Sequence, residues 1–324
     1  MTTAAGDLLR VEDLNVRFGS APIVDRISFT VGHGEAVGLV GESGSGKSMT
    51  ALSLLRLVPE PGRITGGRIA FEGRDLNAMS AREMRAVRLS EIGMIFQDAS
   101  SYLNPIMTIG EQIAEAIGQR RSRSRATHDN VIEVLKAVQI ADPERVAASY
   151  PYELSGGMQQ RAMIASVLIR HPSLIVADEP TTALDATVQH QILKFLAAMR
   201  AELNVALILI SHDLAVISQV CDRVYIMYGG QLVEQGATKA LFDDPKHPYT
   251  VALIASILDP FDPKSSIVAL EGSPPDMRTP PSGCRFHPRC PHAFDKCMTE
   301  EPPDFHFPSG QTAKCWLHQG QAQG

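Results

Sequence analysis

The stretch Gly41-Glu-Ser-Gly-Ser-Gly-Lys-Ser48 decides the fold of this 324-residue chain. It follows the apolar run 36–40, which predicts a buried strand, and precedes a helical pattern over 49–57. The G-x-x-x-x-G-K-S spacing between a strand and a helix is typical of a loop whose backbone N–H groups surround a polyphosphate. Lys47 would reach the β- and γ-phosphates, and the Ser48 hydroxyl would ligate Mg²⁺. A Gly/Ser-rich turn is the alternative, and the complete spacing disfavours it.

Strand and helix patterns alternate along the chain, which predicts an α/β fold with a mostly parallel sheet covered on both faces. The predicted strands are 8–18, 27–31, 68–71, 92–96, 174–178, 205–210, 223–227 and 231–234. The predicted helices are 80–89, 109–117, 131–138, 158–170 and 187–203. The glycine pair at 229–230 predicts a hairpin between the last two strands.

Several predicted strands end in side chains that suit phosphate chemistry, where open α/β sheets bind their ligands. Gln97 is placed to touch Mg²⁺ or the attacking water. Asp178 and Glu179 end a buried strand, an unfavourable place for two carboxylates unless a cation or a reacting water needs them. We assign Asp178 to Mg²⁺ and Glu179 to the water as a base. His212 follows the next strand and suits a γ-phosphate contact better than a purely structural role.

Two further features extend the predicted nucleotide site. Phe18 ends the first strand, where its ring can stack on adenine, and an ordinary core or surface aromatic is an equal alternative. Ser155 stands at the N-cap of a helix behind two glycines, which predicts a second anion-binding helix start, with simple capping as the alternative. The predicted nucleotide-binding residues are Phe18, Gly41, Ser43, Gly44, Ser45, Gly46, Lys47, Ser48 and Met49.

Composition limits the classes of function. The net charge of −6 argues against polyanion binding as the main activity, so no nucleic-acid partner is expected. The cluster Arg120, Arg121, Arg123 and Arg125 favours a solvated loop over a nucleic-acid or lipid patch. Apolar runs are of strand length, short of the about 18 residues that span a bilayer, and the first ten residues do not resemble a secretory signal. We therefore expect a cytosolic protein.

The motifs together resemble the nucleotide-binding subunit of an ABC transporter. Walker A is Gly41–Ser48, the Q-loop residue is Gln97, and Walker B ends at Asp178 and Glu179. The signature sequence includes Ser155, Gly156, Gly157 and Gln159, the D-loop is 183–185 with Asp185, and His212 matches the switch histidine. Phe18 departs from the tyrosine common at the adenine position. The resemblance implies that Ser48, Gln97 and Asp178 bind Mg²⁺ and that Gln97, Glu179 and His212 are catalytic.

The resemblance also implies that one chain holds only half of each ATP site. Two subunits would pack head to tail, and the signature residues of one would cover ATP bound by the other. Closure over ATP would move the coupled membrane subunits, and hydrolysis would reopen the dimer. The implied partners are a second, different ATPase subunit, two membrane-spanning permeases and, indirectly, a solute-binding protein. The implied location is the cytoplasmic face of the cell membrane.

The C-terminal part narrows the resemblance to the ATPases of dipeptide and oligopeptide importers. The residues that carry it are Asp244-Pro-Lys-His-Pro-Tyr-Thr250 and the proline-rich segment 280–290. The implied organisation is an ABC ATPase domain over 1–245, with an antiparallel β subdomain and an inserted helical subdomain at about 98–170, and a small Cys-rich domain over 246–324. The implied solutes are dipeptides, oligopeptides, nickel complexes or related small molecules.

Four of the five cysteines, Cys284, Cys290, Cys297 and Cys315, gather in a segment with little periodic structure. Disulfides are disfavoured in a reducing cytosol. The spacing leaves zinc, with histidine among its ligands, and a [4Fe–4S] cluster nearly equal, and four reduced thiols remain a further alternative. The resemblance to peptide-importer ATPases, some of which hold such a cluster, favours iron–sulfur. Cys221 is expected in the core.

Two other functions compete with transport. One is a soluble ABC ATPase of DNA repair or translation, whose relatives generally join two ATPase cores or insert a long coiled coil. The other is a redox sensor in which the cysteine segment is the active part. The sequence does not name the solute or say whether both ATP sites hydrolyse.

Overall fold

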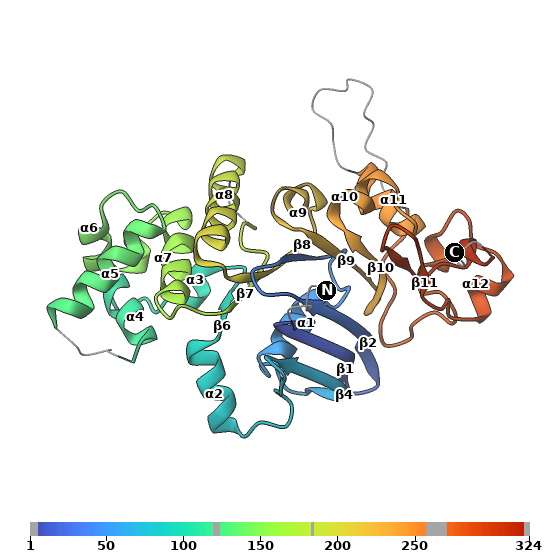
Figure 1. Cartoon of the computed structure of the whole chain (residues 1–324), viewed down its shortest axis with the longest axis horizontal. Coiled ribbons are helices and arrows are strands. Elements are labelled where there is room, and N and C mark those ends of the chain that lie inside the picture. Colours follow the sequence, from blue (N-terminus) through green and yellow to red (C-terminus); the bar gives the residue numbers. More distant parts are fainter. Residues whose placement is uncertain (1–5, 119–123, 183–184, 257–270, 321–324) are drawn as a thin grey trace, which may run out of the picture. The chain divides into compact units, whose positions relative to one another are not determined.

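The computed structural model describes residues 6–118, 124–182, 185–256 and 271–320. The chain forms two compact units. Unit 1 comprises Met1–Ala78 and Leu209–Gly324, and unit 2 comprises Met79–Ile208. Figure 1 labels most of the helices and strands. Among the described residues, no helix combines the length and apolar character needed to cross a membrane.

Unit 1 contains a four-stranded antiparallel sheet (Figure 1). Its order is β2-β1-β4-β5, with bounds Ala21–Val31, Leu9–Phe18, Gly62–Phe71 and Arg74–Asp75. Only two residues separate β1 from β2, a connection that permits antiparallel but not parallel pairing. Apolar residues alternate into the core, with register shifts around Leu14. The predicted alternation of this region is confirmed.

A second set of strands in unit 1 carries the phosphate loop. β3 (Ala36–Val40) is buried throughout and pairs in parallel with β9 (Arg223–Tyr228). β9 forms the predicted hairpin with β10 (Gln231–Ala237), which pairs in turn with β12 (Thr312–Ala313), and β12 pairs with β11 (Phe305–His306). The last three pairings are antiparallel, so the strand pairing is more mixed than the mostly parallel sheet that the sequence predicted.

Unit 1 also contains helices. They are α1 (Lys47–Leu54), α9 (Leu214–Val220), α10 (Thr238–Asp243), α11 (Pro248–Ala255) and α12 (Asp295–Thr299), with short 3₁₀ turns η2 (His287–Arg289) and η3 (Trp316–His318). Cys221 directly follows α9 and is buried, as predicted.

Aromatic side chains tie the C-terminal segment into the core of unit 1. Tyr228 of β9 packs against Tyr249 of α11, with ring centroids 4.7 Å apart. Phe286 packs edge-on against Tyr228 at 5.1 Å and lies 5.4 Å from Tyr249. All three residues are fully buried. The C-terminal segment therefore shares its core with the strand beside β3.

Unit 2 combines two parallel strands with helices. β6 (Ile92–Ile95) pairs with β7 (Leu174–Asp178), and both are entirely buried. The helices are α2 (Ala81–Ser90), α3 (Ala99–Tyr102), α4 (Ile109–Ala116), α5 (Arg125–Ala137), α6 (Pro143–Ala148), α7 (Gly156–Leu168) and α8 (Ala186–Leu203), with the 3₁₀ turn η1 (Pro151–Glu153). Capping boxes at Ser80 and Thr108 fix the starts of α2 and α4. β8 (Ala206–Ser211) contains the point where the chain passes from unit 2 to unit 1.

Candidate ATP site and cysteine-lined cavity

The phosphate loop between β3 and α1 depends on its glycines. Gly44 and Gly46 have φ angles of +79° and +104°, which only glycine adopts readily. A side chain at Gly41 would place its Cβ 2.2 Å from the carbonyl oxygen of Met227. The loop can therefore curl tightly, which is the backbone conformation that a phosphate cradle needs.

Two polar side chains of this loop are buried and suit an anion. The Lys47 ammonium donates to the carbonyl oxygens of Gly41 and Glu42, at 2.6 and 3.0 Å. The Ser45 hydroxyl is buried and has no hydrogen-bond partner within the described part of the chain. A phosphate oxygen would satisfy the Ser45 hydroxyl and accept a charge-assisted bond from Lys47. These residues fit a polyphosphate.

The predicted adenine-stacking residue lies at the end of β1. Phe18 is half-buried, and its ring covers Gly62 of β4 so closely that a Cβ there would lie 2.4 Å from ring carbons. The absence of a side chain at Gly62 thus leaves room for the Phe18 ring. One flank of the ring is fixed by packing, while part of the side chain reaches solvent.

Unit 2 brings two of the predicted catalytic residues together. The Gln97 amide donates to the Glu179 carboxylate over 3.4 Å, although the residues are 82 positions apart. Asp178 is buried at the end of β7. Glu179 adopts a left-handed backbone conformation with φ +46°, which is strained for a residue with a side chain. Such strain is common at functional sites.

Thr182 contacts Glu179, and the sequence analysis did not identify it as a site residue. Its hydroxyl donates to the same Glu179 oxygen at 2.9 Å and so orients the carboxylate. Its position three residues after Glu179, in a turn closed by the bond from the Thr182 N–H to the Glu179 carbonyl, is the signal that could have found it.

His212 belongs to unit 1, where it follows β8 and is exposed. The neighbouring Asp213 caps α9 by accepting from the N–H groups of Ala215 and Val216, at 2.8 and 3.4 Å. This cap fixes the backbone immediately after His212. The loop with Lys47 and Ser48 is in unit 1, and Gln97, Asp178 and Glu179 are in unit 2.

The signature residues begin α7 as predicted. The Ser155 hydroxyl accepts from the Met158 N–H at 3.4 Å, while Gly156 is exposed. A Cβ at Gly157 would lie 2.8 Å from a methyl group of Val188 in α8. The Gln159 amide donates to the carbonyl oxygens of Pro151 and Leu154, at 2.8 and 3.3 Å, and so holds the preceding turn. The glycines permit close packing as well as exposed backbone.

Asp185, the last residue of the predicted D-loop, caps α8. Its carboxylate accepts from the Val188 N–H at 2.9 Å. Residues 183 and 184 of the D-loop lie outside the described part of the chain, as do Arg120, Arg121 and Arg123 of the predicted arginine loop. Arg125, the remaining member of that cluster, starts α5 and is highly exposed.

The four clustered cysteines line one cavity in unit 1. Cys284, Cys290, Cys297 and Cys315 share it with Phe286 and with the histidines His247, His287 and His292. Burial raises the pKa of Cys284 to about 11 and that of Cys315 to about 12, and it also raises the pKa of Cys290. Without a cation these three thiols stay protonated at neutral pH, and metal binding would release their protons.

The predicted metal centre is not supported by coordination geometry. Within the described residues, no group of three or more His, Cys, Asp or Glu side chains is arranged to hold a metal ion. The expectation that the cysteine segment is a metal site therefore depends on its donor chemistry and on the shared cavity.

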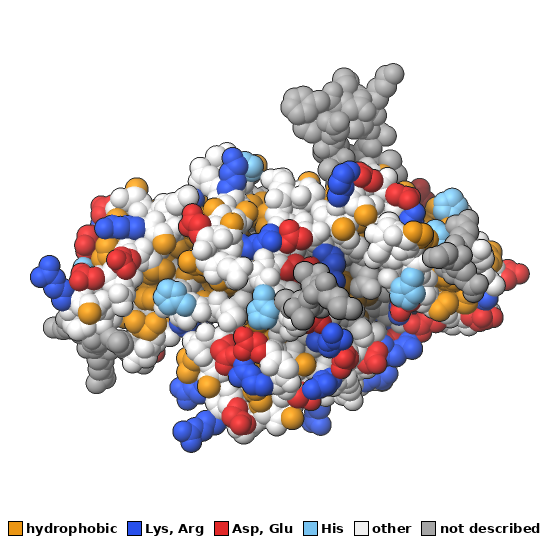
Figure 2. Space-filling view, in the orientation of Figure 1, with side chains coloured by type: hydrophobic (Ala, Val, Ile, Leu, Met, Phe, Trp, Pro, Cys, Tyr) orange, Lys and Arg blue, Asp and Glu red, His pale blue; other side chains and the backbone are white. Residues whose placement is uncertain are grey.

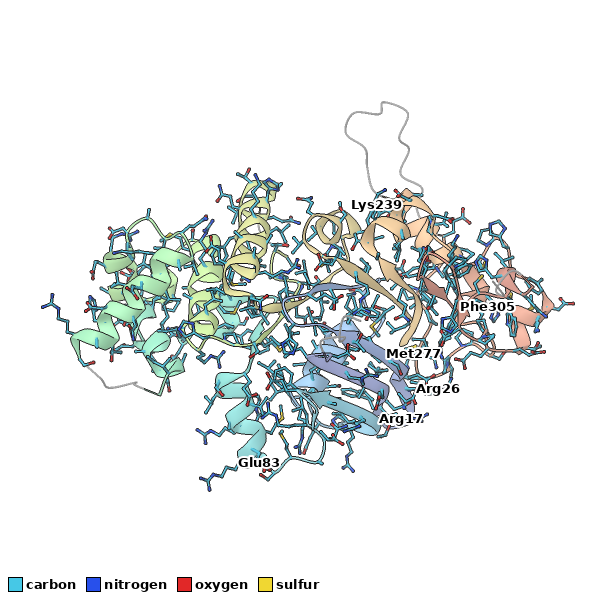
Figure 3. The ribbon with its side chains drawn as sticks, in the orientation of Figure 1. Arg17, Arg26, Glu83, Lys239, Met277 and Phe305 are labelled. Carbon is cyan, nitrogen blue, oxygen red and sulfur yellow. The ribbon has the colours of Figure 1, made fainter. Side chains whose placement is uncertain are left out.

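Ion pairs fasten the cysteine segment to the rest of unit 1. Arg26, labelled on β2 in Figure 3, donates to Glu301 at 2.5 Å. The nearly buried Arg285 pairs with Asp25 and donates to the Gly229 carbonyl. Arg289, whose side chain is 5% exposed, pairs with Glu42 of the phosphate loop. These distant contacts have no signal in the local sequence.

Comparison with known proteins shows the family of the chain. The ABC transporter family model matches residues 24–182, and the model of the oligopeptide/dipeptide transporter C-terminal region matches 233–297. The dipeptide transport ATP-binding protein DppD of Escherichia coli K12 is 44% identical over 95% of this chain and 96% of its own. The oligopeptide transport ATP-binding protein AppD of Bacillus subtilis 168 is 42% identical over 96% and 97%.

Solved structures show the same architecture. A component of the cbiONQ ABC transporter complex of Clostridium perfringens superposes with a TM-score of 0.65 at 27% identity, over 74% of this chain and 91% of its own. A dimeric ATP-binding cassette, bound to ADP and Pi after hydrolysis, gives 0.61 at 26% identity over 71% and 98%.

The fold and the phosphate loop define a P-loop ATPase of the ATP-binding cassette class. The chain belongs to the ABC transporter family, among the ATP-binding subunits that carry the oligopeptide/dipeptide transporter C-terminal region. It is an ABC-type ATPase, as the sequence predicted.

Proposed function

We propose that this chain is the ATP-hydrolysing subunit of an ABC importer that takes up dipeptides, oligopeptides or related small solutes at the cytoplasmic face of the cell membrane. One observation carries the proposal: 44% identity over nearly the whole chain to a dipeptide transport ATP-binding protein. The match includes the C-terminal region typical of such transporters.

Within this function each site residue has a role. The loop residues Gly41, Ser43, Gly44, Ser45, Gly46, Lys47, Ser48 and Met49 would hold the phosphates of ATP, and Phe18 would contact adenine. Mg²⁺, held by Ser48, Gln97 and Asp178, would neutralise phosphate charge. Glu179 would take a proton from the attacking water, and His212 would contact the γ-phosphate. The bonds from Gln97 and Thr182 to Glu179 support its role, because both orient its carboxylate.

Assembly as a dimer completes the proposed mechanism. Ser155, Gly156, Gly157 and Gln159 would face ATP bound by a second ATPase subunit, with Asp185 beside them. The exposed Gly156 and the capped start of α7 support such a contact. A different polypeptide is proposed as the second subunit, which makes the assembly a heterodimer.

Membrane permeases are the other proposed partners, with a solute-binding protein acting through them. Large apolar side chains of unit 2 are unusually exposed: Ile106 at 83%, Tyr152 at 71% and Tyr102 at 57%. They lie in the segments between β6 and α4 and before α7, and exposed apolar groups of this size suit a protein contact.

The domain division follows from the same proposal. We assign 1–245 to the ATPase domain, with the antiparallel strands β1, β2, β4 and β5 as one subdomain and about 98–170 as the helical subdomain. Residues 246–324 form the Cys-rich C-terminal domain. The helices α3 to α7 support the assignment of the helical subdomain, since they span most of the range 98–170.

For the cysteine cavity we propose a [4Fe–4S] cluster held by Cys284, Cys290, Cys297 and Cys315, with Zn²⁺ as the alternative. Four thiols around one cavity match the all-cysteine ligand set of such a cluster. A zinc ion instead needs four ligands about 2.0 to 2.3 Å from a single atom. Iron and acid-labile sulfide in anaerobically purified protein would support the cluster, and one zinc per chain would exclude it.

The alternative of a DNA-repair or translation ATPase is not favoured. The relatives that span nearly the whole chain are transport proteins by name. On the face shown in Figure 2, acidic and basic side chains are interspersed, without one continuous basic patch. An ATPase-linked redox sensor would share the cysteine site. Unlike an importer subunit, it would not be needed for peptide uptake by cells.

Affinity isolation tests the proposed assembly. A Glu179→Gln variant should bind ATP without turnover and hold its partners in the closed state. Isolated from membranes with ATP, it should bring two permeases and a second ATPase subunit. Recovery of ribosomes or DNA-repair proteins would overturn the proposal. A Lys47→Ala variant, which should bind ATP poorly, is the matched control for ATP-dependent assembly.

A further inference from the structure

His247 is a buried histidine that the ATP site does not use. It is 1% exposed and lines the cavity that the four clustered cysteines share. Its ring centroid lies 5.6 Å from that of Phe286, which lines the same cavity. One edge of the imidazole is therefore packed within unit 1 beside the cysteine segment.

Hydrogen bonding fixes the tautomer of His247. Its Nδ1 accepts from the backbone N–H of Tyr249 at 3.0 Å and caps the start of α11. An accepting Nδ1 carries no proton, so the proton of the neutral ring is on Nε2. Nε2 is buried and has no hydrogen-bond partner among the described residues. The cavity is thus lined by an imidazole ring whose only N–H donor is unused.

The backbone around His247 is held firmly. The buried Glu234 carboxylate accepts from the N–H groups of Lys246 and His247, both at 2.8 Å. The His318 Nε2 lies 2.7 Å from the Lys246 carbonyl oxygen and is within hydrogen-bond distance. The ring cannot reach solvent without breaking these contacts, so a partner for Nε2 must come from within the cavity.

We propose that the Nε2–H of His247 donates a hydrogen bond to a sulfur of the iron–sulfur cluster held by the four cysteines. This inference rests on the cluster proposed above. His247 would not be a ligand, because Nδ1 is engaged by α11 and Nε2 carries the proton. It is a positioning residue that sets the reduction potential of the cluster.

The direction of the effect follows from charge. Reduction adds an electron to the cluster and makes its sulfurs more negative, so a donated hydrogen bond stabilises the reduced form more than the oxidised form. Hydrogen bonds to the sulfurs are among the factors that set the potentials of these clusters. Loss of the Nε2 donor should therefore lower the potential.

The test compares two substitutions at this position. Asparagine in His247→Asn can keep the acceptor that caps α11 but is too short to replace Nε2. Glutamine in His247→Gln can extend an amide donor towards the cavity. His292→Asn is the matched control, because His292 lines the same cavity but is exposed. Each anaerobically purified protein is assayed for iron and sulfide and titrated with dithionite and mediators while EPR spectra are recorded.

We expect all three variants to keep the cluster. The reduction potential of the cluster should be lower in His247→Asn than in the wild type. A tenfold change in the ratio of oxidised to reduced cluster at a fixed ambient potential corresponds to a shift of about 59 mV for one electron. His247→Gln should recover much of the shift, and His292→Asn should match the wild type. An unchanged potential in iron-loaded His247→Asn would overturn this inference and leave the cluster intact. Wild-type protein without iron would overturn the cluster and this inference together.

A second measurement tests the hydrogen bond in the wild-type protein, in case His247→Asn loses the cluster. Pulsed EPR of reduced wild-type protein labelled with ¹⁵N-histidine should detect a weakly coupled imidazole nitrogen, and the same signal should persist in His292→Asn and in a His287→Asn protein. Absence of any weakly coupled nitrogen from the wild-type spectrum would contradict the hydrogen bond.

Discussion

Arg289 and Glu42 form a two-pronged ion pair between the cysteine segment and the phosphate loop, although they are 247 residues apart. The guanidinium nitrogens lie 2.6 and 3.0 Å from the two carboxylate oxygens. The Tyr249 hydroxyl accepts from the Glu42 N–H at 2.9 Å, so Glu42 is held through both backbone and side chain. Because Arg289 directly precedes Cys290, the conformation of the cysteine segment bears on the loop that would bind ATP.

Breaking this pair should weaken ATP binding. Arg289→Met removes the guanidinium from a side chain that is only 5% exposed and leaves Glu42 without its main charge partner. We expect a loss in ATP affinity of about tenfold, which corresponds to about 1.4 kcal/mol. Equilibrium binding of a fluorescent ATP analogue measures it.

The control for that prediction is the double variant. Glu42→Gln combined with Arg289→Met removes both charges and should recover part of the affinity, because no unpaired charge remains. Equal affinity of wild type and Arg289→Met would show that the ion pair does not position the loop.

Replacing the proposed base should abolish most turnover. Glu179→Gln keeps the shape of the side chain and its contact with Thr182 but cannot accept a proton. ATP hydrolysis should fall by about 10² to 10⁴, the usual contribution of a general base, while ATP affinity is kept. Glu133→Gln, on the exposed side of α5, should hydrolyse ATP at the wild-type rate. Near-normal hydrolysis by Glu179→Gln would remove Glu179 from the catalytic role.

Gly157 should tolerate no side chain unless α8 makes room. Gly157→Ala places a methyl group 2.8 Å from Val188 and should destabilise unit 2 by about 1 to 3 kcal/mol. Val188→Ala in the same chain should restore the stability measured by urea unfolding. If Gly157 also contacts the partner's ATP, hydrolysis by the assembled complex should stay impaired in the double variant. Full recovery of hydrolysis would limit Gly157 to packing.

The Asp25–Arg285 pair gives unit 1 a pH-dependent contribution to stability. Burial alone would raise the pKa of Asp25, but Arg285 and hydrogen bonds from Arg26 and Gln231 more than offset it and hold that pKa below its usual value. A lowered folded-state pKa stabilises the fold above the unfolded pKa of about 3.9, and this contribution is lost as pH falls below it.

Asp25→Asn should therefore destabilise the protein at pH 7 by about 3 kcal/mol, because Arg285 is left buried without its partner. The difference from wild type should shrink below about pH 4. Trp316 is the single tryptophan and reports on the C-terminal segment, so its fluorescence during urea unfolding gives the comparison. A difference that grows as pH falls would contradict the assigned pKa direction.

Local sequence was sufficient for most elements of the fold. Buried apolar runs predicted β3 and β7 within a residue, because these strands are covered on both sides and show no polar interruption. β2 was placed at 27–31 but starts at Ala21, since Asp25 and a left-handed Arg26 interrupt the alternation that marks a strand. The glycines at 66 and 67 similarly hid the first half of β4.

The site was predictable only where its chemistry is local. The spacing of residues in the phosphate loop predicts phosphate binding, because the conformation of its glycines and the helix that follows are local properties. The contact between Gln97 and Glu179 follows from two strands that end side by side, and so was partly foreseeable. The ion pairs of Arg285 and Arg289 depend on tertiary packing across more than two hundred residues, for which one sequence carries no signal.

The most direct test of the account is peptide uptake by cells that lack this chain. Cells complemented with the wild-type chain should accumulate labelled dipeptides or short oligopeptides, whereas equal amounts of the Glu179→Gln chain should leave uptake at the level of the deletion. Uptake of dipeptides, oligopeptides and nickel that is the same with wild type, Glu179→Gln and no chain would contradict its assignment as the ATPase of such an importer.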